Sequence, residues 1–432
     1  MSRFNSISLL RDREFAALAG TAFARSQAYS TVLIALALYA DVFRTTGVVE
    51  GLFGTAFALV QLLVILPLGR KVDTGNAKRW LLAGFLINVV VFVGFVFVES
   101  AVHVILVRMV QGLGASVLWI TGATVVGEIS PDDEQGRWLG SYNQVAAFSS
   151  MAGDLLGGYL LYAHGFTLPY LVLTLISLGA FGLVWVALRE DPGGRKDPEE
   201  AGGVETFRSL LGLPMLRAMV GFRFAFSFGK MAVIIFLPIY ARTAFGISAF
   251  AIGWILAGGK LSKALMQGVV GNLTDRWGRE HHFVAVGASL YGVGTAAIPL
   301  AAAAEGAITP IEVAFLGDTQ ALGGAFFALF FAYSILGVAD SIRLPASMSL
   351  FVDEGEAYDS VASAMSLRSI SWKVGQVLGP VLVGGTMDLV STEAGFLLAA
   401  GFIGVATVGF VLTARRADAK RRDVVASPAT DD

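Results

Sequence analysis

The stretch Gly271–Arg279 reads GNLTDRWGR, and a second version of it stands in the first half of the chain. That version is Gly69–Arg79, GRKVDTGNAKR. Each has a glycine, an aspartate four residues later, and basic residues after the aspartate. The two glycines are separated by about half of the 432 residues. A repeat at this spacing is typical of membrane transporters in which two related halves enclose a substrate path.

The composition around these loops is that of a membrane protein. The chain is 55% hydrophobic and 15% charged, whereas soluble domains carry about 25% charged residues. It contains no cysteine, which excludes thiolate metal sites and cysteine nucleophiles, and no G-x-x-x-x-G-K-[ST] phosphate-binding loop. The sequence therefore predicts no cofactor, and it argues against ATP as the energy source.

Hydrophobic runs define the predicted fold, because a helix needs about 20 mostly apolar residues to cross a bilayer. We predict an all-α membrane protein with twelve transmembrane helices in two pseudo-symmetric six-helix bundles. The predicted spans are Phe15–Ala40, Val48–Leu68, Trp80–Val98, Val102–Val126, Trp138–Tyr162, Leu168–Leu188, Met215–Tyr240, Ser248–Asn272, His282–Ala304, Ala321–Arg343, Val361–Thr386 and Gly395–Thr413. The stretch Glu305–Gln320 reads as a loop or as a helix lying in the membrane interface.

A long polar segment at residues 189–209 separates the sixth span from the seventh. It predicts an N-terminal bundle over residues 1–188, a linker over 189–214, a C-terminal bundle over 215–414 and a tail over 415–432. On one side of the predicted membrane the loops hold only Arg44 and Arg242, and most other loop Lys and Arg residues fall on the side of the termini. Since basic loops stay in the cytoplasm, we expect both termini to be cytoplasmic in a cell membrane.

Two further patterns accompany the loops. Arg108–Ala115 reads RMVQGLGA in the fourth span, and Gly153–Gly158 reads GDLLGG in the fifth. With these patterns the whole chain resembles the major facilitator superfamily. That family has the loop signature G-x-x-x-D-R-x-G-R, the fourth-helix pattern R-x-x-Q-G-x-G-A, and in its antiporters G-P-x-x-G-G in the fifth helix. The second loop matches in full, the first has Thr74 in place of the arginine, and Asp154 stands where the antiporters have proline.

The resemblance implies a secondary transporter whose two bundles rock about a central site. It implies that Asp73, Asp275, Arg276 and Arg279 act in gating, as latches between the bundles in one state. The alternative is that these loops are solvated turns whose basic residues only set the topology.

Charged residues within the predicted spans are costly in a bilayer and usually face a cavity or a partner. The basic ones are Arg25, Arg108, Arg223, Lys230, Lys260, Lys263, Arg343, Arg368 and Lys373, and the acidic ones are Asp154 and Asp340. Because the cations outnumber the acids, we expect a cation-lined path for an anionic or carboxylate-bearing solute.

We expect the side chains that bind the substrate to come from both bundles. They are Arg25, Asn143, Gln144, Lys230, Lys260, Lys263 and Lys373. The alternative is that several of the cations sit at the membrane rims. Arg223, Arg343 and Arg368 lie nearer the span ends, from which a long side chain can reach the headgroups.

Arg108 and Asp154 lie at similar predicted depths on adjacent spans. We hypothesise that they pair, directly or through Gln111, and that protonation of Asp154 couples transport to protons. The alternative is a permanent structural ion pair.

The predicted function is therefore secondary active transport of a small molecule, coupled to an ion gradient for which we expect protons, with a proton-driven multidrug efflux antiporter as the alternative. A transporter-like sensor is a remote alternative, and no catalytic constellation suggests an enzyme. The partners expected are the substrate and the lipid bilayer. With a net charge of −2, nothing suggests nucleic acid binding. The sequence is compatible with a monomer and does not fix the oligomeric state.

Overall fold

The computed structural model describes residues 6–131, 134–190, 204–278, 280–315, 318–358 and 360–426. A short 3-10 helix, η1 (Ser6–Arg11), precedes the first bundle. The helices of the first bundle are α1 (Arg13–Phe43), α2 (Gly47–Thr74), α3 (Ala77–Val96), α4 (Ala101–Ile129), α5 (Gln135–His164) and α6 (Thr167–Ala187). Those of the second bundle are α8 (Pro214–Phe245), α9 (Ala249–Trp277), α10 (Glu280–Ala297) with α11 (Ala301–Ala304), α12 (Gly324–Glu356), α13 (Val361–Leu389) and α14 (Thr392–Ala426).

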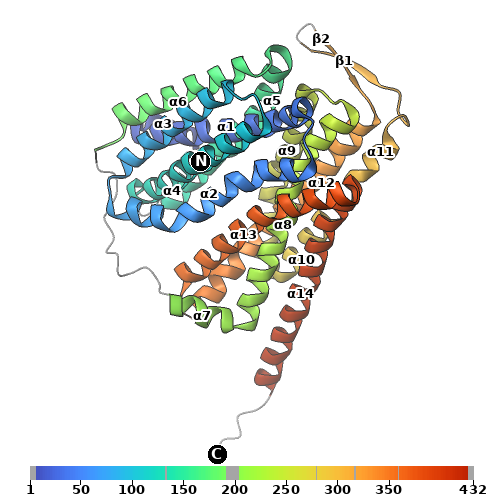
Figure 1. Ribbon diagram of the computed structural model, residues 1–432. Helices are drawn as coiled ribbons and strands as arrows, with labels where there is room; N and C mark the ends of the chain where they lie inside the picture. Colours follow the sequence, from blue (N-terminus) through green and yellow to red (C-terminus); the bar gives the residue numbers. More distant parts are fainter. Residues whose placement is uncertain are drawn as a thin grey trace, which may run out of the picture.

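Each predicted span coincides with one of these long helices or, for the ninth, with α10 and its continuation. Ten helices of the described part are long and apolar enough to cross a membrane. The remaining two long helices, α5 and α13, have 30 and 29 residues but a more polar composition. The prediction of a twelve-helix membrane protein in two halves is confirmed. The two polar helices both lie where the halves meet, α5 against α9 and α13 against α2 (Figure 1).

The stretch Glu305–Gln320 is neither the plain loop nor the interfacial helix expected. It contains most of an antiparallel hairpin of β1 (Ile311–Phe315) and β2 (Asp318–Leu322), in which Ile311 pairs with Leu322. Its first strand, IEVAF, is mostly apolar with two β-branched residues, and the ladder satisfies backbone groups that a loop would leave to water. The hairpin carries the chain across the face opposite the termini.

Two other departures lie in the second half. Between α10 and α11 the chain tightens into a 3-10 turn, η3 (Ile298–Leu300), where Pro299 supplies no backbone N–H for an α-helical bond. The segment expected to be a plain linker contains a short helix, α7 (Val204–Gly212), which packs on α8 and α13.

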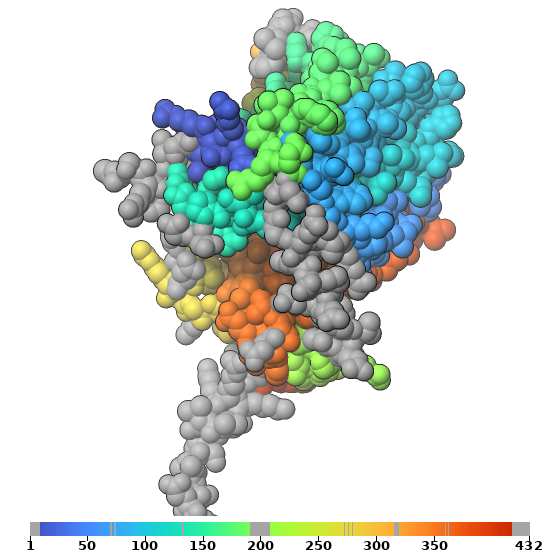
Figure 2. Space-filling model, turned by 90° about the vertical axis from the view of Figure 1, so that its left-hand side faces the viewer, coloured from blue at the N-terminus to red at the C-terminus, as the bar shows by residue number. Residues whose placement is uncertain are grey.

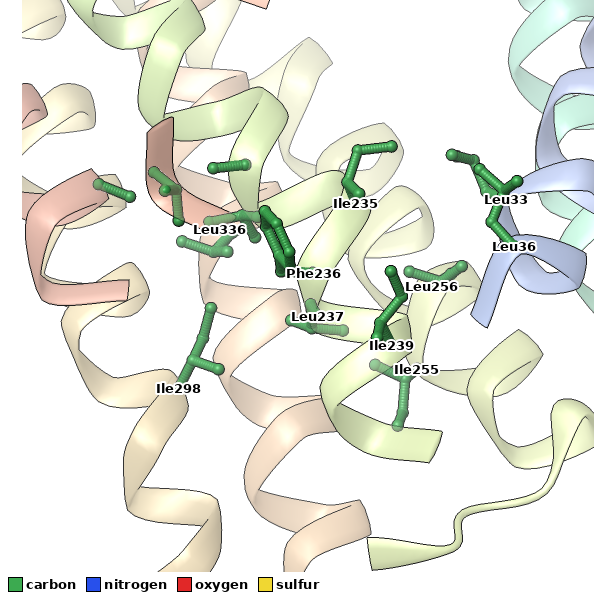
Figure 3. Packing of buried hydrophobic residues seen from close by; sticks show 14 of the residues in the cluster. Leu33, Leu36, Ile235, Phe236, Leu237, Ile239, Ile255, Leu256, Ile298 and Leu336 are labelled. Carbon is green, nitrogen blue, oxygen red and sulfur yellow. The ribbon is translucent and has the colours of Figure 1, made fainter. Parts of the chain in front are cut away.

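The two halves share one hydrophobic core at the face opposite the termini, here called the outer face. Leu33 and Leu36 of α1 belong to the same buried cluster as Ile235 and Ile239 of α8 and Leu256 of α9 (Figure 3). Small residues bring the backbones together there. A Cβ added to Gly51 of α2 would run into the backbone of Pro380 in α13. Packing of this closeness drives helix association in lipid.

Polar contacts close the same face. The Asp388 carboxylate of α13 accepts the backbone N–H groups of Gly47 and Val48, at 2.6 and 2.9 Å. These groups belong to the N-terminus of α2, where the helix dipole favours a negative charge. Arg242 of α8 pairs with Asp41 of α1 at 2.7 Å. Loops from both halves are therefore tied together at the outer face.

Toward the termini the halves diverge. Among the described residues, side-chain hydrogen bonds between the halves go no further toward the termini than Ser30, Gln61 and Ser150 in the first half. In the second half, α9 is mostly buried up to Gly259 and largely exposed from Lys260 to Val269. Figure 2 views the termini face, where the helix ends of the first half lie above those of the second. The structure is closed at the outer face and open toward the termini.

Because the chain has no cysteine, this closure can be tested by cross-linking. In the variant Asp41→Cys/Arg242→Cys, a short bifunctional thiol reagent should hold the outer face shut and reduce transport by at least tenfold, and a reducing agent that cleaves the reagent should restore it.

The matched control is Glu14→Cys/Arg189→Cys, which replaces an ion pair that lies within the first half. The same reagent should leave its transport unchanged. Full activity of the cross-linked Asp41→Cys/Arg242→Cys variant would contradict opening at this face.

Candidate functional site between the two halves

An ion pair joins the halves at the centre of the α5–α9 contact. Asp154 is fully buried, and its Oδ2 lies 2.6 Å from Nζ of Lys260. The ammonium group of Lys260 also donates to Ser30 Oγ at 2.8 Å and to the Ser150 carbonyl at 3.3 Å. A Cβ on Gly253 of α9 would collide with the backbone carbonyl of Asp154, so the glycine lets α9 approach the carboxylate-bearing turn. One cation of the second half is thus bound by three groups of the first.

The direct pairing predicted between Asp154 and Arg108 is wrong. Arg108 donates from Nε to the Phe53 carbonyl at 2.9 Å and from Nη1 to Gln111 Oε1 at 2.7 Å. Its guanidinium also lies 4.2 Å from the centre of the Phe57 ring. Arg108 and Gln111 therefore fasten α4 to α2 within the first half. Equal depth in the membrane does not fix which way a side chain faces around its helix.

A second carboxylate gathers three cations. Asp340 of α12 is buried, and its oxygens lie 2.8 Å from Lys230 of α8, 2.6 Å from Lys263 of α9 and 2.8 Å from Arg343 of α12. All four residues belong to the second half. One carboxylate cannot neutralise three cations, so the cluster keeps an excess of positive charge.

A further arginine, Arg223, lies near Arg343 of this cluster. Arg223 stacks on Trp372 at 4.1 Å and Arg343 on Phe226 at 3.9 Å. Nε and Nη1 of both arginines are buried without a hydrogen-bond partner. Phe226 follows Arg223 by three residues and so shares its helix face, which brings the two guanidinium groups to one region. With 1% and 7% of their surface exposed, Arg343 and Arg223 do not reach the headgroups, and the snorkelling alternative is wrong for both.

Lys373 makes a further cationic contact between the halves, besides those of Arg242 and Lys260. It donates to Gln61 Oε1 of α2 at 2.5 Å, and this partner is neutral. Lys373 follows Trp372, whose ring lies 5.9 Å from Nζ of Lys230. Lys260 and Lys373 thus stand on the two contacts that border the space between the halves, one on the α5 side and the other on the α2 side.

The other predicted binding residues lie apart from this group. Arg25 stacks on Trp119 at 4.1 Å within the first half. Asn143 and Gln144 are exposed on the part of α5 nearer the termini. Nothing in the geometry ties these three residues to the two carboxylates, and their binding role stays a prediction.

The predicted gating loops stay untested. Arg276 is exposed at the end of α9. Arg279, and the side chains of Asp73 and Asp275, lie outside what the structure describes.

Several members of the site were not predicted from the sequence. Ser30 and Gln61 supply polar atoms to the lysines, and each is a polar residue within an apolar run. Tyr333 of α12 packs against Gly259 and interacts electrostatically with both Asp154 and Asp340. The two carboxylates therefore face a common region, about one helical turn apart along α9, since Lys260 and Lys263 differ by three positions.

The pair Asp154–Lys260 predicts an asymmetric response to substitution. Lys260→Gln leaves a fully buried carboxylate without its cation and should destabilise the protein by about 3 kcal/mol. Asp154→Asn leaves Lys260, whose side chain is 27% exposed, with Ser30 and should cost about 1 kcal/mol. Tryptophan-monitored thermal unfolding of purified protein measures both.

The double variant Asp154→Asn/Lys260→Gln should be about as stable as Asp154→Asn alone, because the buried charge is gone. Equal losses from the two single substitutions that add up in the double variant would contradict a coupled pair.

Comparisons with known proteins agree with this architecture. The family model described as Major Facilitator Superfamily matches residues 18–232 and again residues 219–429. An MFS-type transporter of Methanocaldococcus jannaschii is 22% identical over 359 residues, which cover 82% of this chain and 86% of that protein. The synaptic vesicular amine transporter of Rattus norvegicus is 24% identical, with 83% of this chain and 64% of that protein covered. Multidrug resistance protein 1 of Bacillus subtilis is 24% identical over 55% of this chain and 61% of its own length.

Solved structures share the fold. A bacterial homologue of the human lysosomal transporter Spinster, in an inward-facing conformation, superposes with a TM-score of 0.70 at 16% identity, covering 96% of this chain and 98% of that one. A peptide transporter of the POT family gives a TM-score of 0.73 at 15% identity, covering 93% and 94%. With two family matches that together span nearly the whole sequence, the chain is a member of the major facilitator superfamily of membrane transporters.

Proposed function

We propose that this protein is a secondary active transporter that moves a small anionic or carboxylate-bearing solute by alternating access, driven by a proton gradient. The observation that carries the proposal is the surplus of positive charge where the halves meet. Of the two carboxylates there, Asp154 is taken by Lys260 and Asp340 by three cations. Lys373 has only a neutral amide as its partner.

The surplus has a physical consequence. A charged group withdrawn from water costs several kcal/mol unless it is paired. Arg223 and Arg343 keep buried N–H groups without partners, and Lys230 and Lys263 reach the same carboxylate as Arg343. A solute with a negative group would relieve this cost, whereas a cationic solute would increase it. Guanidinium groups also offer the paired donors that carboxylates and phosphates accept.

The Asp154–Lys260 pair offers a route for coupling. It crosses between the halves, so it must break when the outer face opens. Protonation of Asp154 would remove the charge that holds Lys260, and an anionic solute bound to Lys260 would compete for the same ammonium group. Proton and solute then act on one contact, as coupled transport requires.

A proton-driven efflux antiporter for cationic drugs or amines is the second candidate. It is favoured by the relatives named as a multidrug resistance protein and a vesicular amine transporter. Such a substrate needs a free carboxylate. Asp154 and Asp340, the two carboxylates of the site described above, are already paired with cations. The site therefore favours the anionic solute.

Uptake into proteoliposomes decides between the two. A panel of mono- and dicarboxylates, phosphate esters and lipophilic cations should give pH-gradient-driven transport of anions only. For a transported anion, Lys373→Gln should raise KM about tenfold. The substitution removes a positive charge whose partner, the Gln61 amide, is neutral, so this charge is available to the solute.

The control is Lys71→Gln, which removes an exposed cation near the end of α2, away from the residues between the halves. Its KM should stay within twofold. Transport restricted to cations, or equal effects of the two lysine variants, would rule out the anion proposal.

Asp154→Asn should abolish the dependence of transport on the pH gradient while solute exchange across the membrane continues. The substituted amide cannot lose or take up the proton, yet it still fills the space against Ser30 and Lys260. Counterflow of labelled solute without a gradient provides the readout for exchange. An unaltered gradient dependence in a well-folded variant would exclude Asp154 from coupling.

A further inference from the structure

A groove runs between α8 and α14 on the outside of the second half, away from the site between the halves. Its volume is about 1150 Å³, and its walls are formed by residues 214–225 of α8 and 397–416 of α14. Most of the lining residues are apolar or glycine. At Gly221, Gly401 and Gly409 an added Cβ would meet nothing within 4 Å, so the groove is open along its length. It exceeds the 300–1,000 Å³ typical of pockets for drug-sized ligands.

One end of the groove is cationic. Arg217 and Arg416 line it and are both exposed. Arg416 ends the membrane-spanning part of α14, which places this end at headgroup level. The sequence beyond it continues with Lys420, Arg421 and Arg422. Basic clusters directly after a transmembrane helix attract anionic lipids.

The apolar wall on α8 matches one leaflet in length. Residues 214–225 of α8 cover about 16 Å at 1.5 Å per residue. Half of a bilayer core of about 30 Å is about 15 Å. The α14 wall, residues 397–416, is longer and covers about 29 Å. The groove thus joins a headgroup-level pair of arginines to an apolar channel at least as deep as one leaflet.

We propose that the α8–α14 groove is a binding site for an anionic phospholipid of the leaflet on the termini side, with its acyl chains along the apolar wall and its phosphate between Arg217 and Arg416. This inference rests on a groove on the outside of the second bundle, and it does not depend on which solute the protein carries.

A second copy of the chain fits the groove less well. A two-fold dimer places the same patch of each subunit opposite itself. Arg217 and Arg416 would then face their own copies at the membrane surface, with no acidic residue among the lining residues to separate them. An anionic headgroup supplies the missing negative charge.

Native mass spectrometry of the purified full-length protein tests the site. Phosphatidylglycerol and phosphatidylcholine with identical acyl chains are titrated separately, and their dissociation constants compared. The intact protein should prefer phosphatidylglycerol, and Arg217→Gln/Arg416→Gln should weaken that preference by on the order of fivefold for each arginine removed. The matched control, Arg415→Gln, removes an exposed neighbour that does not line the groove and should retain the preference.

The apolar wall is tested by Gly401→Leu/Gly409→Leu, which puts side chains into open space on α14. This variant should lose tight binding of both lipids. Equal binding of the two lipids by the intact protein, or the same loss of preference in Arg415→Gln as in Arg217→Gln/Arg416→Gln, would overturn the proposal. A shift from dimer to monomer on filling the groove, without loss of lipid, would assign it to a second copy instead.

Discussion

A charge inside a bilayer is stable only beside an opposite charge, a hydrogen-bonding group or water, and this constraint shapes the interior of the protein. Asp154 is buried completely and holds a lysine from the other half. Asp340 holds cations that reach it from three helices. Polar residues collect on α5 and α13, the two long helices that are too polar to count among the ten apolar spans. The halves meet through these helices, α5 against α9 and α13 against α2.

The two carboxylates differ in what a rocking motion does to them. The partners of Asp340 all belong to the second half, so that cluster can move as a unit. The Asp154–Lys260 and Lys373–Gln61 contacts each have one partner in each half, so they exist only while the outer face is closed. A solute that binds these lysines changes the energy of closing directly. The same solute could bind the Asp340 cluster without favouring either state, unless it bridges to the first half.

The fold could be predicted from the sequence far better than the site. Apolar runs of bilayer length determine helices in lipid, because no other element satisfies its own backbone there. The hairpin after α11 was not predicted, because it follows the end of a span, where the argument from bilayer length does not apply. For the site, residue type and depth selected Asp154, Lys260 and Lys373 as candidates, and all three make contacts between the halves. Depth did not reveal that Arg108 turns toward α2, since the direction of a side chain depends on which neighbour its helix face meets.

The contacts that close the outer face must be individually weak for the protein to cycle. The Arg242–Asp41 pair is partly exposed, at 31% and 40% of the two side chains, and such pairs contribute about 0–1 kcal/mol. Asp388 acts through a helix N-terminus, an interaction of about 0.3–1 kcal/mol at an exposed site. The Asp154–Lys260 pair is the exception, because separating it leaves the fully buried Asp154 carboxylate without its cation. Among the polar contacts between the halves, this pair therefore contributes most to holding the outer face closed, and it is the contact on which the proposed proton and anionic solute would both act.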